Sequence, residues 1–335
     1  MLEHRPVLMR STSRRRFLQI IAATSVSGLG MIRAGAAENA AIQSWEGEAL
    51  GADVSITLSG LDRYRAERLL RSCRQEIARL ERIWSLYRPN SSLSRLNANG
   101  ALANPPVELT ALLDTCRKLF VLSEGRFDPT IQPLWRLYAE TYGNVRSPRA
   151  PEAPEVAARH TVIGFDAVSW SEHRVQFAKS GMAMTLNGIA QGFITDRIAA
   201  ILRGGGATHA LVNVGEYASI GRHPEGRAWQ VGIQDPRNAG DIVDIMELVD
   251  QSVATSGAYG GRFGDSGVNH LIDPRTGRSP ERYLSVSVRN ESATLADGLS
   301  TAFSFMSEDD ITMATERIGG SSVVLVRADG TLARI

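Results

Sequence analysis

Three groups of residues in the sequence have side chains and spacings that could carry out chemistry. The first is the run Asn187-Gly-Ile-Ala-Gln-Gly192, which follows the apolar stretch Met184-Thr-Leu186 and opens a helix predicted to reach about Leu202. Small residues at a strand-to-helix turn let the backbone approach a phosphate or a metal ion, and the first turn of the helix carries unpaired amides. Such runs are also common in plain turns, so both interpretations stay open.

The second group combines a carboxylate with a hydroxyl. Asp297 and Thr301 are four residues apart, so a helix places both side chains on one face. Hard oxygen ligands of this kind suit Mg²⁺, which takes few protein ligands and completes its shell with water and phosphate oxygens. In the alternative interpretation Asp297 only caps the helix and Thr301 only packs.

The third group contains a histidine. The run Ala254-Thr-Ser-Gly-Ala-Tyr-Gly-Gly-Arg262 is followed by Asn269-His-Leu-Ile-Asp-Pro-Arg-Thr-Gly277, which puts His270 in a predicted strand just before a turn. An imidazole in such a place can act as an acid or a base near neutral pH. A histidine with a purely structural role explains the pattern equally well at this stage.

The sequence lacks the signatures of several common classes of protein. No Walker loop, no Gly-x-Gly-x-x-Gly after a strand, no His-Glu-x-x-His and no Gly-x-Ser-x-Gly occurs, which argues against P-loop, Rossmann, zinc-protease and α/β-hydrolase chemistry. The two cysteines, Cys73 and Cys116, have apolar neighbours that predict buried thiols rather than a disulfide. With 37 basic and 36 acidic residues, the chain is not a general electrostatic binder of nucleic acid.

Hydrophobic periodicity predicts the elements that must position these groups. Apolar residues that recur every three or four positions predict helices at 62–84, 108–123, 187–202, 293–306 and 310–318. Alternating or short apolar runs predict strands or hairpins at 44–58, 168–177, 210–214, 229–233, 245–253, 269–272, 284–288 and 322–333. Residues 143–160 have the composition of a surface excursion. Because helices and strands do not alternate strictly, the pattern favours an α+β fold over a doubly wound sheet.

The N-terminus is typical of a twin-arginine export signal over residues 1–36. Ser13-Arg-Arg-Arg-Phe-Leu-Gln19 precedes a short apolar stretch and the small residues Ala34-Gly-Ala36. Cleavage after Ala36 removes six arginines and one glutamate and leaves 31 basic and 35 acidic residues in a single domain at 37–335. We therefore expect export by the twin-arginine machinery to the periplasm. No run of 18 apolar residues predicts a spanning helix, and neither cysteine lies in the signal, where a lipid-attachment cysteine would be needed, so we expect a soluble protein rather than a lipoprotein.

Taken in order, six segments resemble the ApbE family of FAD:protein FMN transferases. The matching segments lie between about Leu50 and Met306 and comprise 85–97, 125–134, 185–192, 255–257, 270–277 and 296–302. The resemblance implies an ApbE-like α+β fold with a mixed, largely antiparallel sheet and flanking helices. It also implies transfer of the FMN half of FAD to a threonine or serine of a target flavoprotein, with release of AMP.

The resemblance implies roles for particular residues. Asp297 and Thr301, with the backbone carbonyl of Gly188, would bind Mg²⁺, and His270 would assist deprotonation of the incoming hydroxyl. The remaining implied positions contact the flavin cofactor FAD, and they are Leu50, Tyr87, Arg126, Phe127, Asp128, Thr185, Gln191 and Leu284. The alternative for Tyr87 and Phe127 is a place in the core, and for Leu50 and Leu284 a place as strand fillers.

The sequence also departs from the family pattern. Many members have Asp-Leu-Gly-Gly-Ile-Ala-Lys-Gly where this chain has Thr185, Asn187 and Gln191, and many have a small residue in place of Arg126. With twin-arginine export, this pattern is similar to the NosX branch, which serves a membrane flavoprotein of nitrous-oxide respiration in denitrification. Two alternatives remain open: a periplasmic FAD-binding maturation protein without transferase activity, and an FAD pyrophosphatase that releases free FMN.

The chain does not carry a good acceptor site of its own. Acceptor sites of the family's targets typically end in Ser/Thr-Gly-Ala-Thr, and the nearest match is Gly205-Gly-Ala-Thr208, which lacks the leading hydroxyl residue. We therefore expect the acceptor to be another protein, a periplasmic or membrane-anchored flavoprotein with an acceptor threonine or serine.

Overall fold

A computed structural model describes residues 42–49, 52–143, 149–238, 240–263 and 268–335. The predicted export signal at 1–36 and the predicted flavin contact Leu50 lie outside these described residues. None of the helices in the described ranges is long and apolar enough to cross a membrane.

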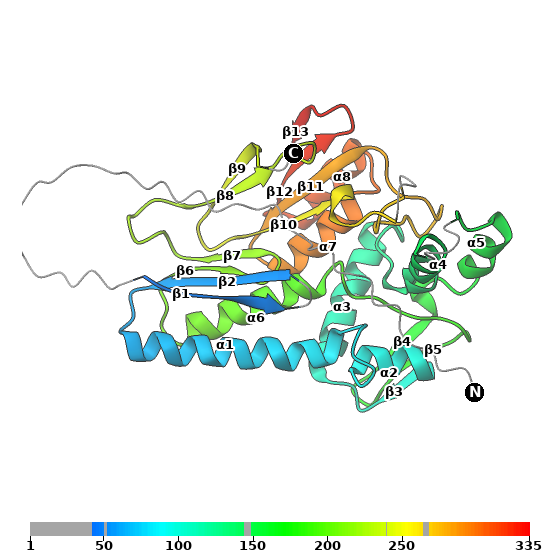
Figure 1. Ribbon diagram of the computed structural model, residues 1–335, viewed down its shortest axis with the longest axis horizontal. Coiled ribbons are helices and arrows are strands. Elements are labelled where there is room, and N and C mark those ends of the chain that lie inside the picture. Colours follow the sequence, from blue (N-terminus) through cyan, green and yellow to red (C-terminus); the bar gives the residue numbers. More distant parts are fainter. Residues whose placement is uncertain (1–41, 50–51, 144–148, 239, 264–267) are drawn as a thin grey trace, which may run out of the picture.

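Among the described residues the main sheet has eight strands, and every pair of neighbours is antiparallel. In spatial order the strands are β1 (Gln43–Ala49), β2 (Ala52–Ser59), β6 (His209–Asn213), β7 (Tyr217–Ile220), β10 (Ser252–Gly257), β11 (Tyr283–Asn290), β12 (Ser322–Arg327) and β13 (Leu332–Arg334). The predicted α+β class is confirmed, because this sheet is flanked by helices (Figure 1). Its described strands are antiparallel throughout, whereas the resemblance implied a mixed, largely antiparallel sheet.

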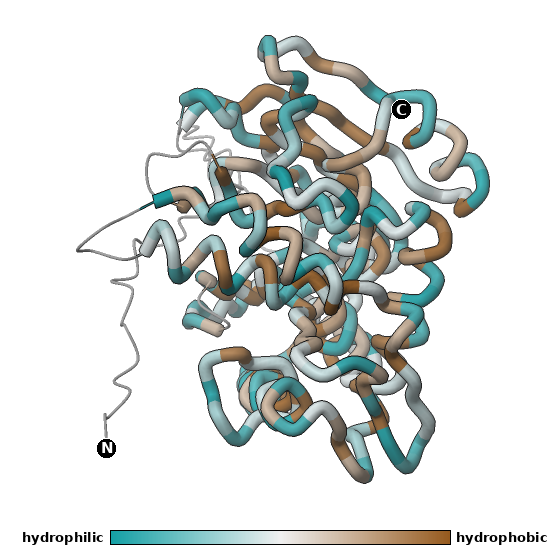
Figure 2. The backbone as a smooth tube through the Cα atoms, turned by 90° about the vertical axis from the view of Figure 1, so that its right-hand side faces the viewer, coloured by the Kyte–Doolittle hydropathy of each residue, from teal (hydrophilic) through white to brown (hydrophobic). Residues whose placement is uncertain are grey.

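Helices cover one face of the main sheet and enclose the largest hydrophobic core. The helices of the described ranges are α1 (Arg63–Trp84), α2 (Ser92–Asn99), α3 (Val107–Leu122), α4 (Gln132–Tyr142), α5 (Ala153–His160), α6 (Ala190–Gly204), α7 (Ala293–Phe303) and α8 (Glu308–Ile318). All of them except α4 and α5 contribute buried residues to this core. In Figure 1, α6 lies between the first strands of the sheet and α1. Figure 2, which colours the chain by residue hydropathy, shows many hydrophobic residues in the interior and hydrophilic residues mainly on outer turns.

A two-stranded hairpin covers the opposite face of the sheet. Its strands are β8 (Trp229–Gln234) and β9 (Ile242–Leu248). Leu211 of β6 packs with this hairpin, whereas its neighbours Ala210 and Val212 belong to the helix-covered core. This alternation is what a strand buried on both faces requires, since successive side chains point to opposite sides.

Two smaller units complete the fold. A three-stranded sheet has the order β3 (Ala101–Ala103), β5 (Arg174–Phe177) and β4 (Val168–Trp170). A separate apolar cluster joins α4 to the loop after β10, through Leu134, Leu137 and Tyr138 on the helix and Phe263 and Ile272 on the loop. Short 3-10 turns lie at Pro129–Ile131, Phe165–Ala167 and Ala258–Gly260.

The structure corrects three of the predicted strands. Residues 245–253 are not one strand, because β9 and β10 are separated by a turn in which Asp250 has a φ of 52°. Residues 269–272 form only an isolated bridge between Asn269 and Arg262. There the chain satisfies its own polar groups locally, since the Asn269 side chain accepts from the Leu271 N–H at 2.9 Å. Residues 184–186 are also not a strand.

Several elements were not predicted. These are α2, β3, α4 and β7, together with α5, which lies inside the predicted surface excursion at 143–160. The helices at 63–84, 107–122, 190–204, 293–303 and 308–318 confirm the predicted ones to within a few residues. Cys73 and Cys116 are buried free thiols, as predicted.

Candidate functional site

The site begins where α6 meets α7. A Cβ atom on Gly192 would lie 2.2 Å from the carbonyl oxygen of Ala293 and 2.8 Å from the Cβ of Asp297, so only glycine allows this approach. The Gly192 N–H donates to Oδ2 of Asp297 at 2.9 Å. Asp297 is 5% exposed and lies inside α7, whose N-cap is Ser292. Asp297 therefore does not cap its own helix, and its carboxylate instead accepts from an N–H in the first turn of α6.

Thr301 lies one turn further along α7 and faces the glycine run. Its Oγ1 is 3.4 Å from the carbonyl oxygen of Gly188, two residues before the start of α6. A Cβ on Gly188 would come within 2.9 Å of that hydroxyl oxygen, so glycine is needed here as well. The structure thus brings Gly188 and Thr301 together, while Asp297 meets Gly192 on the next turn.

A serine from the central sheet joins this arrangement. The Oγ of Ser256, on β10, lies 3.3 Å from Oγ1 of Thr301 and 2.8 Å from Oγ of Ser300. Sequence reasoning gave Ser256 no role of its own, although it is the middle residue of the Thr255-Ser-Gly257 motif. Its contacts hold the Thr301 hydroxyl between β10 and the glycine run.

These donors fit a hard divalent cation that also binds a phosphate ligand. A carbonyl, a carboxylate and a hydroxyl are all oxygen donors of the kind that Mg²⁺ prefers. Within the described ranges no group of three or more His, Cys, Asp or Glu side chains could hold a metal. Asp297 would supply a carboxylate to such a site, and water and phosphate oxygens would supply the ligands that Gly188 and Thr301 do not.

His270 lies in the loop that follows β10. Its N–H donates to the carbonyl oxygen of Gly261 at 2.8 Å, and its Nδ1 lies 3.2 Å from the same oxygen. Because a carbonyl can only accept, this contact favours the neutral tautomer with its hydrogen on Nδ1, in which Nε2 is the basic nitrogen. A Cβ on Gly260 would lie 3.1 Å from the ring. The half-buried imidazole therefore rests against two glycines.

Helix α4 anchors this histidine loop. The Tyr138 hydroxyl donates to the carbonyl oxygen of Gly277 at 2.7 Å. Phe263 meets Trp135 edge to face, with 5.5 Å between ring centroids. Burial raises the pKa of Tyr138, so its hydroxyl keeps its proton and remains a donor. The contact was missed because α4 itself was not predicted.

The segments around Asp128 and Thr185, both assigned to FAD by the resemblance, lie against each other. The Thr185 N–H donates to the carbonyl oxygen of Pro129 at 2.9 Å, and Oγ1 of Thr185 accepts from the Asn187 N–H at 3.2 Å. Gln191 is buried in the first turn of α6, and Leu284 is half-buried on β11. Thr185 thus links the segment after Asp128 to the glycine run.

The aromatic positions differ in exposure. Tyr87 is 77% exposed, so it is not a core aromatic and its ring is accessible to a ligand. Phe127 is 5% exposed and packs in the main core. The alternative of a core place therefore describes the Phe127 side chain and does not describe Tyr87.

Asp128 uses its carboxylate inside the protein. Oδ1 accepts from the N–H and the hydroxyl of Thr130, at 2.7 and 2.6 Å, and Oδ2 accepts from the Phe165 N–H at 3.1 Å. Burial raises the pKa of this carboxyl, against the opposite effect of the hydrogen bonds. The side chain therefore shapes the turn that leads into α4.

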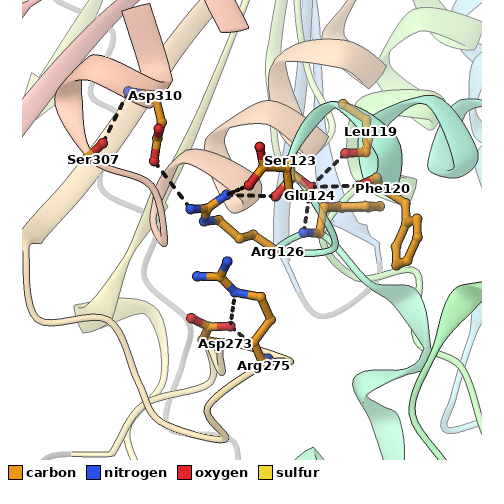
Figure 3. A network of polar contacts seen from close by, with 10 residues as sticks. Leu119, Phe120, Ser123, Glu124, Arg126, Asp273, Arg275, Ser307 and Asp310 are labelled. Atoms are coloured by element: carbon orange, nitrogen blue, oxygen red, sulfur yellow. Dashed lines mark hydrogen bonds and ion pairs between the residues drawn. The ribbon is translucent and has the colours of Figure 1, made fainter. Parts of the chain in front are cut away.

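Arg126 connects α3 to α8, as Figure 3 shows. Its guanidinium donates to the Ser123 carbonyl at 3.2 Å, to Glu124 at 3.2 Å and to Asp310 at 3.3 Å. The side chain is 12% exposed. Arg275, which pairs with Asp273 at 3.6 Å, appears in the same close-up. The arginine that departs from the family pattern is thus built into the framework of the protein.

Comparisons with known proteins identify the family and the fold of the chain. The sequence profile of the ApbE family matches residues 50–325. FAD:protein FMN transferase of Vibrio cholerae is 32% identical over 67% of this chain and 69% of its own, and that of Haemophilus influenzae is 29% identical over 73% and 74%. The crystal structure of the ApbE protein of Thermotoga maritima superimposes with a TM-score of 0.77 at 29% identity, over 88% of this chain and 97% of its own. The apo flavinyl transferase ApbE of Pseudomonas stutzeri has a TM-score of 0.75 at 26% identity, over 88% and 96%.

Proposed function

Because the chain belongs to the ApbE family, we propose that it transfers the FMN half of FAD to a hydroxyl group of an acceptor protein. The chain is an FAD:protein FMN transferase. The single observation that carries the proposal is that α7 places Thr301 against the Gly188 carbonyl and, one turn earlier, Asp297 against the Gly192 N–H. These residues are the ones that a metal-assisted phosphoryl transfer needs.

The reaction breaks one bond and forms another at the same phosphorus. The acceptor hydroxyl oxygen bonds to the phosphorus on the FMN side of the FAD pyrophosphate, the bridging P–O bond breaks, and AMP leaves with the bridging oxygen. Nε2 of His270 takes the hydroxyl proton, because the Gly261 carbonyl fixes the hydrogen on Nδ1. Mg²⁺, when held by Asp297, Thr301 and the Gly188 carbonyl, supplies charge neutralisation at the phosphate oxygens.

The acceptor and the compartment are the finer part of the proposal. We infer a threonine or serine of a periplasmic or membrane-anchored flavoprotein as acceptor, because the export signal predicted at 1–36 directs the chain across the inner membrane. We further infer that the acceptor is the flavoprotein of nitrous-oxide reduction. This inference is supported by the departures from the family pattern at Thr185 and Gln191 and by the predicted export.

The test incubates the mature protein with FAD, Mg²⁺ and a candidate flavoprotein domain. In-gel flavin fluorescence reports FMN on the acceptor, and chromatography reports AMP. We expect a fluorescent acceptor band and one AMP per transferred FMN, both abolished by EDTA. AMP with free FMN and a dark acceptor would indicate a pyrophosphatase, and FAD bound without AMP would indicate a binding protein. The possibility of a binding protein is motivated by Thr185 and Gln191, which would then be the first residues to change back to those of the family pattern.

A further inference from the structure

Asp196, on α6, is bonded to the first turn of α7. Its Oδ1 accepts from the Ala293 N–H at 2.8 Å. Its Oδ2 accepts from the Ser292 hydroxyl at 2.8 Å, from the Thr294 N–H at 2.9 Å and from the Thr294 hydroxyl at 2.6 Å. One carboxylate thus receives four hydrogen bonds from three consecutive residues.

The charge of Asp196 suits this place. The first turn of α7 presents backbone amides and the positive end of the helix dipole, which favour an anion. The side chain of Ser292 also caps α7 by accepting from the Leu295 N–H at 3.2 Å. The N-terminus of α7 is therefore held by its own cap and by a carboxylate from a neighbouring helix.

Asp196 and the metal residues are linked through the same two helices. Gly192 lies four residues before Asp196 on α6, and Asp297 lies four residues after Ala293 on α7. The pair of Gly192 with Asp297 and the pair of Asp196 with Ala293 are thus about 6 Å apart along the helices. Two such contact points fix both the sliding and the rotation of α7 against α6.

We propose that Asp196 is a positioning residue of the metal site: it holds α7 so that Asp297 and Thr301 face the segment that carries Gly188. This inference rests on the proposed function, because it assumes that these residues bind the cation. Asp196 acts through α7 and need not touch the metal or FAD. Loss of its charge releases the start of α7 and lets Asp297 and Thr301 move away from Gly188.

The test measures Mn²⁺ binding rather than turnover. Electron paramagnetic resonance counts bound Mn²⁺ in the presence of saturating ADP, which supplies the adenosine and pyrophosphate of FAD but no transferable flavin. We expect Asp196→Asn to weaken Mn²⁺ binding about tenfold or more, because an amide cannot accept all four of the hydrogen bonds that hold the start of α7. Thr294→Val, which removes one of the four donors and leaves the Ser292 cap intact, should weaken it by about two- to tenfold.

A destabilised control separates positioning from a general loss of stability. Val231 is buried between the β8–β9 hairpin and the sheet, in a hydrophobic cluster separate from the one that contains α6 and α7. Val231→Ala should lower the melting temperature and leave Mn²⁺ binding by the folded protein unchanged. If Asp196→Asn does not fold, Thr294→Val decides the question in the same assay.

The outcomes distinguish the two proposals. Wild-type protein that binds no Mn²⁺ with ADP would overturn the metal site of the proposed function itself. Wild-type protein that binds Mn²⁺, with Asp196→Asn and Thr294→Val binding it equally well, would overturn the role of Asp196 alone.

Discussion

At the scale of residues, two glycines decide whether the site can exist. Gly188 and Gly192 each leave no room for a Cβ, since one would meet the Thr301 hydroxyl and the other the backbone of Ala293. The sequence run around them suggested a turn that approaches a phosphate. The structure gives these glycines a more specific reason, which is contact with the helix that carries the proposed metal ligands.

Gly192→Ala should therefore damage both the fold and the site. The added methyl group would lie 2.2 Å from the Ala293 carbonyl oxygen and would force α6 and α7 apart. We expect a loss of about 1–3 kcal/mol in unfolding free energy, measured with urea, and a loss of FMN transfer. The control is Gly204→Ala in the same helix, which meets nothing within 4 Å and should leave transfer unchanged.

The buried thiols should make the folded protein less stable as the pH becomes alkaline. Burial raises the pKa of Cys73 to about 12, whereas an unfolded thiol loses its proton near about 8.5. The stabilising contribution of the protonated thiol is therefore complete below that lower pH and is lost as the pH rises toward the folded pKa. In urea unfolding, the stability of wild type relative to Cys73→Ala should fall between about pH 8 and pH 10. A difference that stays constant over this range would contradict the assignment.

At the scale of elements, α4 determines how firmly the His270 loop is held. Tyr138→Phe removes the hydrogen bond to the Gly277 carbonyl and should lower kcat for transfer by about two- to tenfold. Tyr142→Phe is the matched control. Tyr142 belongs to the same helix and stacks on Tyr138, with 6.2 Å between the ring centroids. Equal kcat values for the two variants would show that this anchor does not matter for catalysis.

The β8–β9 hairpin covers the sheet and lies apart from the proposed chemistry. Ile233→Ala, at a position that is 1% exposed, should cost about 2–5 kcal/mol in unfolding free energy. Ile245→Ala, at a position of the same hairpin that is 43% exposed, should change it by less than about 0.5 kcal/mol. Calorimetric melting of the two variants checks this, and comparable losses would contradict the placement of the hairpin core.

The elements that sequence reasoning found are those with a regular hydrophobic period. Helix α1 repeats its buried residues over 22 positions and was predicted almost to the residue. The strand predicted at 245–253 was wrong, because apolar residues on both sides of Asp250 hide the turn at that residue. The loop at 269–272 looks like a strand by composition, yet side-chain hydrogen bonds satisfy its backbone. Short elements such as α2 and β7 carry too few residues to show a period.

At the scale of the whole molecule, the sequence predicted the residues proposed to carry out the chemistry, but it did not predict the residues that hold them in place. Asp297, Thr301 and His270 stood out because a carboxylate, a hydroxyl and an imidazole have evident chemistry. Asp196 and Ser256 did not, because their roles depend on contacts between residues 44 or more positions apart in the chain. Only the folded arrangement reveals such partners.

The proposed compartment is a property of the whole chain. If residues 1–36 form a twin-arginine signal, the double variant Arg14→Lys and Arg15→Lys should leave the precursor in the cytoplasm, while wild type yields a shortened periplasmic protein. Cell fractionation with immunoblotting reads both. Unchanged export of the double variant would count against this signal, without affecting the assignment of the site.

The most direct test of the site as the centre of FMN transfer is Asp297→Asn. The amide keeps the shape of the side chain and can still accept from the Gly192 N–H, so the melting temperature should stay near that of wild type. Transfer to the acceptor, measured by in-gel flavin fluorescence over a Mg²⁺ titration, should fall by about 100-fold or more. Transfer within about threefold of wild type, at the same Mg²⁺ dependence, would contradict the account.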